Sequence, residues 1–255
     1  MKVGEGEEIA LVDENGKRCV LNTSSKKRKI KGFGIVDPKR FIGIDYGTKI
    51  RLSQKDVWVL KPSSFDRWSS LRRKAQIILP KDAAHIIVNC SIVPGCVVVE
   101  GGIGSGSLTC ILSQIVGKEG KIISYEKRKD FKKFAERNLR DVGLGENIEI
   151  KERDITEGIE ERDVDAVILD IPNPWDVVEH AYNALKVGGY FCSYSPLVSQ
   201  VERTVKTLRE YPFIEIRTIE TLQREMVVVE KGVRPSFDML GHTGYLTFAR
   251  KVLEV

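Results

Sequence analysis

The sequence lacks the features that mark membrane and secreted proteins. No apolar run approaches the roughly 20 residues that a membrane-spanning helix requires. The first seven residues, MKVGEGE, contain no apolar stretch like that of a secretory signal peptide. We therefore expect a cytoplasmic protein that does not associate with a membrane.

Metal-ligating residues are also scarce. The chain has three histidines and five cysteines, and no two cysteines form a C-x-x-C pair. None of the cysteines has a zinc-like spacing to a histidine. We expect buried free thiols and no bound metal.

What is present describes an ordinary globular protein. The 255 residues are 42% hydrophobic and 30% charged, which suits one or two domains with a sizeable core. The net charge of +5 is too small to indicate a nucleic-acid partner by itself. Basic residues do gather over 26–31, 67–74 and 127–133. A charge run is usually only a solvent-exposed face, but three such clusters in one chain favour a polyanionic partner. The candidates for phosphate contacts are Lys26, Lys27, Arg28, Lys29, Arg72 and Arg73.

The chain divides into two regions with different sequence patterns. Residues 1–62 are typical of a small β-domain, with short apolar segments and a hairpin signal at Asn15-Gly16. Residues 63–75 resemble a charged linker helix. The region 63–255 alternates apolar strands with helical patterns. This alternation predicts an α/β fold, a doubly wound, Rossmann-like parallel sheet with helices on both faces.

A glycine-rich turn follows the first buried strand of the second region. The segment 97–109 reads VVVEGGIGSGSLT. Glycines let the backbone approach a ligand closely, and the helix that follows presents free N–H groups to it. In an open α/β sheet this turn lies at the carboxyl ends of the strands, where ligands bind. The alternative is a tight turn without a ligand.

Details of the turn favour S-adenosylmethionine over NAD. The dinucleotide motif G-x-G-x-x-G needs a third glycine, but Ser107 and Thr109 occupy the two candidate positions. Glu100 suits an amino-acid ammonium better than a pyrophosphate. Ser105, Ser107 and the helix amides could hold a carboxylate.

Acidic residues follow the next strands in order. Glu126 ends the second strand, about 20 residues past the turn, and suits a ribose diol. Asp154 follows the third and could accept from an adenine amino group, or simply cap a turn. Asp170 ends the fully apolar fourth strand in the run DIPNPW, whose prolines stiffen the turn. Runs of this kind hold a planar nitrogen beside the methyl donor in amino-methyltransferases.

Four segments together resemble the tRNA (adenine-N1)-methyltransferase family, which has an N-terminal β-domain. They are QIILPKDAA at 76–84, EGGIGSGSLT at 100–109, DIPNPW at 170–175 and HTGYLTFAR at 242–250. The resemblance covers nearly the whole chain and looks closest to archaeal members. It implies S-adenosylmethionine as cofactor, a homotetramer, and methylation of N1 of adenosine 58 in the tRNA T-loop, with position 57 as a further target.

The resemblance also implies the site residues. Asp170 is expected to be catalytic, accepting from the N6 amino group of a flipped adenine and stabilising its developing charge. Trp175, His242 and Tyr245 are candidates to contact that base. Leu79 stands where many members carry Tyr or His. The residues expected to bind the cofactor are Gln76, Ile78, Leu79, Glu100, Gly102, Ile103, Gly104, Ser105, Gly106, Ser107, Glu126, Lys127, Asp154, Ile155 and Asp170.

Two other functions stay open at this point. The same fold supports protein isoaspartate and small-molecule methylation, against which the turn after Asp170 and the β-domain argue. A non-catalytic tRNA-binding subunit is the other alternative. The intact residues Gly104, Gly106, Glu126 and Asp170 speak against it.

Overall fold

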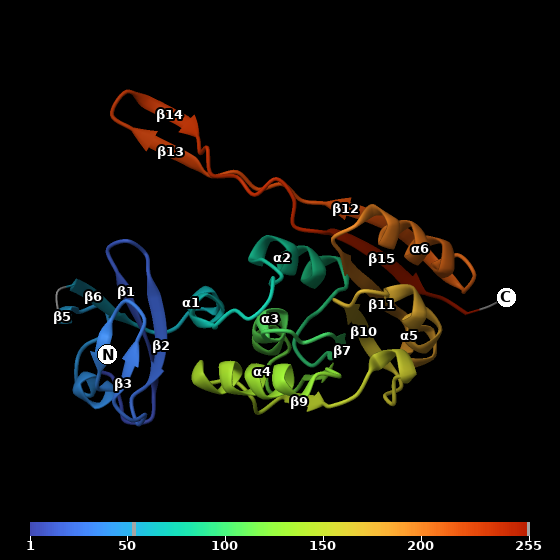
Figure 1. The fold of residues 1–255 in the computed structure, drawn as a ribbon. Coiled ribbons are helices and arrows are strands. Elements are labelled where there is room, and N and C mark those ends of the chain that lie inside the picture. Colours follow the sequence, from blue (N-terminus) through green and yellow to red (C-terminus); the bar gives the residue numbers. More distant parts are fainter. Residues whose placement is uncertain (53–54, 254–255) are drawn as a thin grey trace.

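The computed structural model describes residues 1–52 and 55–253, which form an N-terminal β-domain and an α/β domain (Figure 1). The β-domain is built on an antiparallel sheet in the order β2-β1-β6-β5. The Asn15-Gly16 hairpin is confirmed, since β1 pairs with β2 and Asp13 accepts hydrogen bonds from the N–H groups of Asn15 and Lys17. The elements are β1 Glu8–Asp13, β2 Arg18–Asn22, β3 Arg28–Ile30, β4 Gly34–Val36, η1 Pro38–Phe41, β5 Lys49–Leu52 and β6 Lys55–Leu60.

The linker between the domains is helical only in its first half. Helix α1, Ser64–Ser70, begins at a capping box in which Ser63 and Asp66 satisfy each other's backbone N–H groups. The expected helix over 63–75 is thus too long. Residues 71–79 run as a loop across the α/β domain to α2, Pro80–Asn89, whose first residue is a proline. The sequence pattern had not indicated α2.

The α/β domain contains a seven-stranded sheet in the order β12-β15-β11-β10-β7-β8-β9. Strands β7 to β11 are parallel, as predicted, but β15 is antiparallel to both β11 and β12. The expected doubly wound, Rossmann-like sheet is present, and it differs from a purely parallel sheet only at this edge, because no helix joins β12 to β15 and the chain doubles back. The strands are β7 Val97–Gly101, β8 Lys121–Tyr125, β9 Ile148–Lys151, β10 Val164–Leu169, β11 Leu185–Ser195, β12 Phe213–Glu220 and β15 Tyr245–Lys251.

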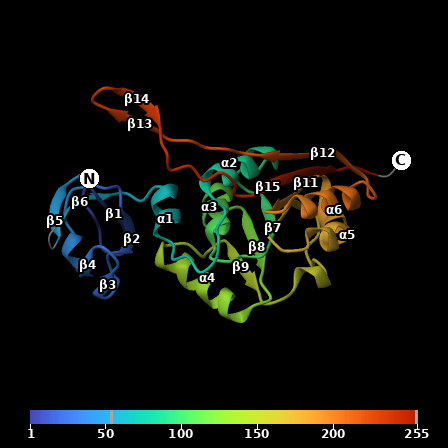
Figure 2. The ribbon, with the colours of Figure 1, turned by 45° about the horizontal axis from the view of Figure 1, so that its top comes forward.

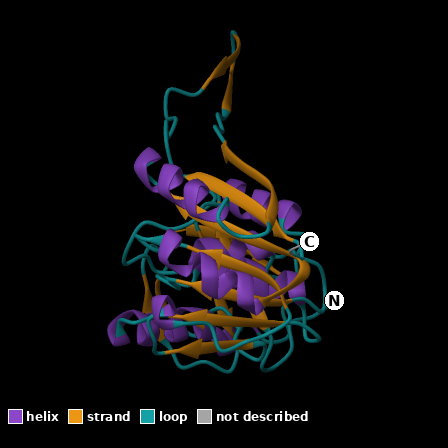
Figure 3. Ribbon diagram, turned by 90° about the vertical axis from the view of Figure 1, so that its right-hand side faces the viewer, coloured by secondary structure: helices purple, strands orange, loops and turns teal. Residues whose placement is uncertain are grey.

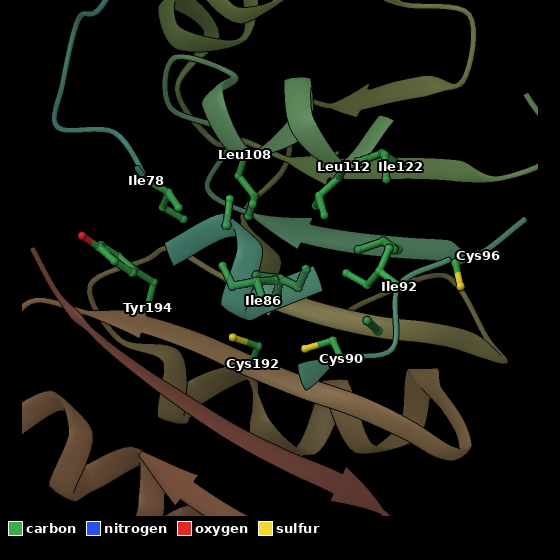
Figure 4. Close-up of a cluster of buried hydrophobic side chains, with 14 of the residues drawn as sticks. Ile78, Ile86, Cys90, Ile92, Cys96, Leu108, Leu112, Ile122, Cys192 and Tyr194 are labelled. Carbon is green, nitrogen blue, oxygen red and sulfur yellow. The ribbon is translucent and has the colours of Figure 1, made fainter. Parts of the chain in front are cut away.

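Helices cover both faces of this sheet (Figure 3). Buried side chains of α2 and α3 form one apolar cluster on it, and those of α5 and α6 form another. The five cysteines are buried and free, as predicted, and Cys90 and Cys192 lie together in the first cluster (Figure 4). The remaining helices are α3 Ser107–Val116, α4 Lys129–Asp141, η2 Ile155–Glu157, η3 Pro174–Val177, α5 Val178–Ala184 and α6 Val198–Leu208.

A hairpin arm extends from the body between β12 and β15. Its strands are β13, Met226–Val229, and β14, Gly232–Pro235. Both views show the hairpin projecting away from the sheet and its helices (Figures 1 and 2). Its apolar side chains are largely exposed, and nothing in the sequence pattern had predicted it. Within the described ranges no helix is long and apolar enough to cross a membrane.

Candidate active site

The glycine-rich turn joins β7 to α3 at the carboxyl edge of the sheet. Gly102, Gly104 and Gly106 all have positive φ, which glycine adopts without strain. At Gly102 a side chain would also collide, because an added Cβ would lie 2.2 Å from the carbonyl oxygen of Asp170. Helix α3 begins without a side-chain cap, so its first N–H groups are free for an anionic ligand group.

Asp170 lies directly beside this turn. Its backbone N–H donates to the carbonyl of Gly101 at 2.8 Å, which ties the ends of β10 and β7 together. Burial raises the pKa of the Asp170 carboxyl from 3.8 to about 7. A carboxyl poised near neutrality at the edge of a parallel sheet is typical of a functional site rather than of a structural ion pair.

Glu126 follows β8 at the same edge and is almost fully buried. One carboxylate oxygen accepts from the N–H and the side chain of Arg128, at 3.0 and 3.1 Å. The other oxygen, Oε2, is buried without a hydrogen-bond partner among the described residues. A buried carboxylate oxygen without a donor is costly. A ribose diol would supply the missing donor, so the residue present fits the expected group.

Asp154 and its neighbours form the next part of the edge. Asp154 caps η2, since one oxygen accepts from the backbone N–H and the hydroxyl of Thr156, and Lys127 pairs with the other at 3.0 Å. Burial acts to raise the pKa of Asp154, but these partners outweigh it and hold the pKa below its usual value. Ile155 is buried. The capping alternative is therefore realised, and any contact to an adenine amino group would use the carboxylate that Lys127 now pairs with.

One cavity of about 190 Å³ connects these groups. Gly102, Glu126, Asp154 and Asp170, from four different strand ends, all line it. Ligand sites are usually about 300–1,000 Å³, so this cavity suits part of a nucleoside-containing ligand. A larger open groove of about 930 Å³ lies at the other end of α3, and no predicted site residue lines it.

Three of the expected cofactor residues point elsewhere. Glu100 is buried below the turn and accepts from the hydroxyls of Ser124 and Thr109, the latter at 2.6 Å. Burial, reinforced by the charge of Asp170, raises its pKa to about 7 against the effect of those hydrogen bonds. Ser105 is buried, and its hydroxyl accepts from the N–H of Lys74 at 3.1 Å. Ile103 packs in the apolar cluster beneath the linker.

Residues 76–79, three of which are expected to bind the cofactor, lead into α2. Gln76 is exposed and donates to the carbonyl of Thr243 at 3.4 Å. Ile78 is buried in the main core, and Leu79 is half-buried at the start of α2. Ser107 is buried in the first turn of α3. The path of this segment is therefore set partly by core packing.

The expected base-contacting residues come from two segments, since Trp175 lies in η3 shortly after Asp170, and His242 and Tyr245 lie at or just before the start of β15. Trp175 is half-buried, and the guanidinium of Arg203 sits 3.9 Å from the centre of its ring. His242 and Tyr245 lie with their ring centres 4.9 Å apart. The His242 ring also contacts Glu220 at 2.6 Å and the carbonyl of Pro196 at 2.8 Å, so both of its nitrogens are engaged.

The structure adds polar groups that the sequence pattern did not reveal. The hydroxyls of Ser193, Tyr194 and Ser195, at the end of β11, are buried without partners among the described residues. Nearby, the ammonium of Lys81 bonds Asp82 at 2.7 Å and the hydroxyl of Thr243 at 2.7 Å. Lys81, Asp82 and Thr243 lie in two of the segments that carry the family resemblance, but the sequence does not show that these side chains meet, because only the packing of α2 against the loop before β15 brings them together.

Two of the basic clusters meet at one end of α4. Asp141 pairs with Arg28 of the β-domain, at 3.2 Å, and with Arg72 of the linker. Lys26, Lys27 and Lys29 are exposed, as is Arg73, whose guanidinium lies 5.2 Å from the ring centre of Trp68. Within the described part of the chain, no group of His, Cys, Asp or Glu is arranged to hold a metal ion.

The strand order and the edge site together define a Rossmann-like methyltransferase, a fold class that uses S-adenosylmethionine. Solved structures agree: an S-adenosylmethionine-dependent O-methyltransferase from Thermotoga maritima is 37% identical with a TM-score of 0.84, covering 100% of this chain and 96% of that one. The tRNA (m1A58) methyltransferase TrmI from Aquifex aeolicus is 26% identical, with a TM-score of 0.78 over the full length of both chains.

The chain belongs to the family described as tRNA methyltransferase complex GCD14 subunit, whose profile matches residues 55–234. A relative from Methanocaldococcus jannaschii is 41% identical over 94% of this chain and 93% of its own. It is named tRNA (adenine(57)-N(1)/adenine(58)-N(1))-methyltransferase TrmI. A tRNA (adenine(58)-N(1))-methyltransferase TrmI of Thermus thermophilus is 34% identical over 77% of this chain and 78% of its own. The family resemblance found in the sequence is thus confirmed.

Proposed function

We propose that this chain transfers the methyl group of S-adenosylmethionine to N1 of adenosine 58 in the T-loop of tRNA, with adenosine 57 as a second target. The observation that carries the proposal is the position of Asp170. Its carboxyl has a pKa of about 7 and shares one cavity with Glu126, whose free oxygen suits a ribose. The activities named for the archaeal and bacterial relatives support the choice of acceptor.

The proposed chemistry needs no base. Adenine N1 carries a lone pair, so it would accept the methyl group directly as the carbon–sulfur bond of the donor breaks, with the electron pair of that bond left on sulfur. The bound donor supplies an activated methyl group on a sulfonium. The product ring is cationic. Asp170, once ionised, accepts a hydrogen bond from the N6 amino group, orients the ring and stabilises the developing positive charge.

The remaining edge residues would hold the donor. Glu126 would accept from the ribose hydroxyls, and Asp154 with the N–H of Ile155 would meet the adenine ring. The uncapped N–H groups of α3 would bind the carboxylate of the methionine part. Leu79, Gln76 and Ile78 would cover it. Glu100, whose oxygen bonds Thr109 and Ser124, would support the turn from below.

Binding of tRNA would use the exposed basic residues of the β-domain and linker. Lys26, Lys27 and Lys29 lie near Arg28 in the sequence, and Arg28 and Arg72 share Asp141. Phosphate contacts of this kind make the affinity fall steeply with salt. The adenine would be turned out of the tRNA stack and would contact Trp175, His242 and Tyr245.

We further propose that the protein assembles as a homotetramer through its hairpin arm. An isolated two-stranded hairpin is only marginally stable in water, and this one exposes Met226, Val228 and Val233, with the exposed Phe237 directly after it. A second copy of the chain would cover these side chains and extend the sheet. The mass of the wild type at micromolar concentration can be measured by size-exclusion chromatography with light scattering. A mass below that of four chains would refute the tetramer.

The decisive experiment incubates the protein with labelled S-adenosylmethionine and an unmodified tRNA transcript, then maps the modified nucleoside. A transcript with guanosine at position 58 is the matched control. We expect N1-methyladenosine at position 58 and a large loss of label with the control. The relative described as an O-methyltransferase makes 2′-O-methylation an alternative outcome. Label in a ribose or in protein, or none with any tRNA, would contradict the proposal; the last result would favour a non-catalytic subunit.

A further inference from the structure

The loop of residues 71–74 is held to the donor turn by one buried side chain. Asn138 lies on α4 and is almost fully buried. Its amide donates to the carbonyl of Ser105 at 2.9 Å and to the carbonyl of Arg72 at 2.8 Å. Its oxygen accepts from the N–H of Arg72 at 3.3 Å. Both amide hydrogens are thus used, each on a different segment of backbone.

A second hydrogen bond joins the same two segments. The N–H of Lys74 donates to the hydroxyl of Ser105 at 3.1 Å. Ser105 lies between Gly104 and Gly106, both of which have positive φ. The turn is therefore positioned in part by the linker, through Ser105, which does not line the cavity.

The arginine side chains of the same linker lie at the surface, where Arg72 pairs with Asp141. Arg72 and Arg73 are exposed and belong to the basic surface proposed to meet tRNA phosphates. The backbone of Arg72 is bonded through Asn138 to the turn proposed to bind the donor. If the linker shifts when phosphates bind, the movement would accordingly be transmitted to the carbonyl of Ser105 through the two hydrogen bonds that the Asn138 amide donates.

We propose that Asn138 is a positioning residue that couples tRNA binding at the linker to donor binding at the glycine-rich turn. It touches neither substrate, and acts by holding Arg72 and Ser105 at a fixed separation. The proposal rests on the assignment of donor and tRNA to this site. Because coupling between two binding sites is reciprocal, tRNA tightens donor binding by the same factor as the donor tightens tRNA binding.

The test measures binding of S-adenosylhomocysteine by calorimetry, with and without a saturating unmodified tRNA transcript. This product cannot react, so both ligands can be present together. For the wild type we expect tRNA to tighten its binding by about fivefold or more, the lower end of typical couplings. The isosteric change Asn138→Asp turns both donated hydrogen bonds into repulsive contacts between oxygen atoms. In this variant we expect S-adenosylhomocysteine to bind more weakly, and tRNA to have no effect on that binding. In steady state the KM for S-adenosylmethionine rises more than kcat falls.

Asn147, directly before β9, provides a matched control at the other end of α3. Its amide donates to the carbonyls of Ser113 and Gly117, at 2.8 and 2.7 Å, so Asn147→Asp makes the same chemical lesion away from the donor turn. We expect Asn147→Asp to lower the melting temperature but to keep the wild-type dependence on tRNA. If Asn138→Asp does not fold, Asn138→Ser, which buries no charge, allows the same comparison.

The outcomes separate the two proposals. Three results would overturn the role of Asn138 while leaving the activity in place. They are a wild type whose binding of S-adenosylhomocysteine does not change with tRNA, Asn138 variants in which that change persists, and an Asn147→Asp variant that loses the change equally. A wild-type protein that binds no S-adenosylhomocysteine would overturn the donor site itself and, with it, the coupling.

Discussion

Replacing Asp170 by Asn should make the protein more stable and nearly inactive. Burial raises the pKa of Asp170 from 3.8 to about 7, so the folded protein holds this proton more tightly than the unfolded chain. The difference corresponds to about 4 kcal/mol of unfavourable ionisation at neutral pH. Part of the side chain faces the cavity and keeps some solvent, which reduces the expected gain in the Asn variant to about 1–3 kcal/mol.

The sign of the pH dependence follows from the raised pKa. Between about pH 4 and pH 7 the unfolded chain releases the proton while the folded protein retains it, so wild-type stability falls as the pH rises through this window. The amide of the Asp170→Asn variant does not titrate, and the stability difference between the two proteins should therefore be absent near pH 4 and complete above pH 7. Activity should show the opposite trend in the wild type, rising through about pH 7 as Asp170 ionises.

The assay compares urea unfolding and methyl transfer for both proteins from pH 4 to pH 8. Removal of one preorganised electrostatic group typically lowers kcat about 10²- to 10³-fold. Asp163→Asn is the control: it lies just before the same strand, is exposed, and has a positive φ that Asn tolerates. An Asp170→Asn protein that is less stable than the wild type above pH 7, or retains wild-type turnover, would refute the reasoning.

Three further changes test other parts of the structure. Gly102→Ala should destabilise the protein and abolish donor binding, since its Cβ would lie 2.2 Å from a carbonyl oxygen. Gly104→Ala has open space around it and should cost only about 1 kcal/mol of backbone strain. Equal losses of stability in thermal unfolding of the two variants would contradict this difference. Lys81→Met should lower stability by about 3–5 kcal/mol in urea unfolding, because it leaves the buried carboxylate of Asp82 unpaired; an unchanged midpoint would argue against the pair. Glu220 raises the pKa of the His242 ring above 6.5. The stability lost in His242→Gln should therefore be largest below pH 6.5 and vanish as the pH rises through the raised pKa. A loss of stability that does not depend on pH would mean that the ring acts only by packing.

Much of the α/β domain could be predicted because its signals are local. The β-branched runs of β7 and β10 are what strands buried on both faces require, and the helix expected after the glycine-rich turn is α3. The acidic residues that follow successive parallel strands necessarily gather at one edge. Glu126, Asp154 and Asp170 accordingly line one cavity.

Other site features could not be predicted because they depend on contacts between distant segments. Glu100 and Ser105 carry the right chemistry at the right motif positions, yet their oxygens are engaged by Thr109 and by Lys74. The sequence shows which groups can form hydrogen bonds but not which neighbour reaches them first. Asn138 has no motif around it, and its role is visible only once α4 lies against the linker.

The sequence by itself therefore determined the fold class, the family, and the edge of the sheet at which the chemistry would occur, because strand period, glycine turns and motif order are properties of short segments. Only the tertiary structure decided the antiparallel course of β15, the exposed arm and the partners of each buried carboxyl. Those depend on which segments pack together, and on how far packing removes a group from water. The pKa of Asp170, near 7 rather than near 4, is the clearest case, since its cause is burial by residues from other elements.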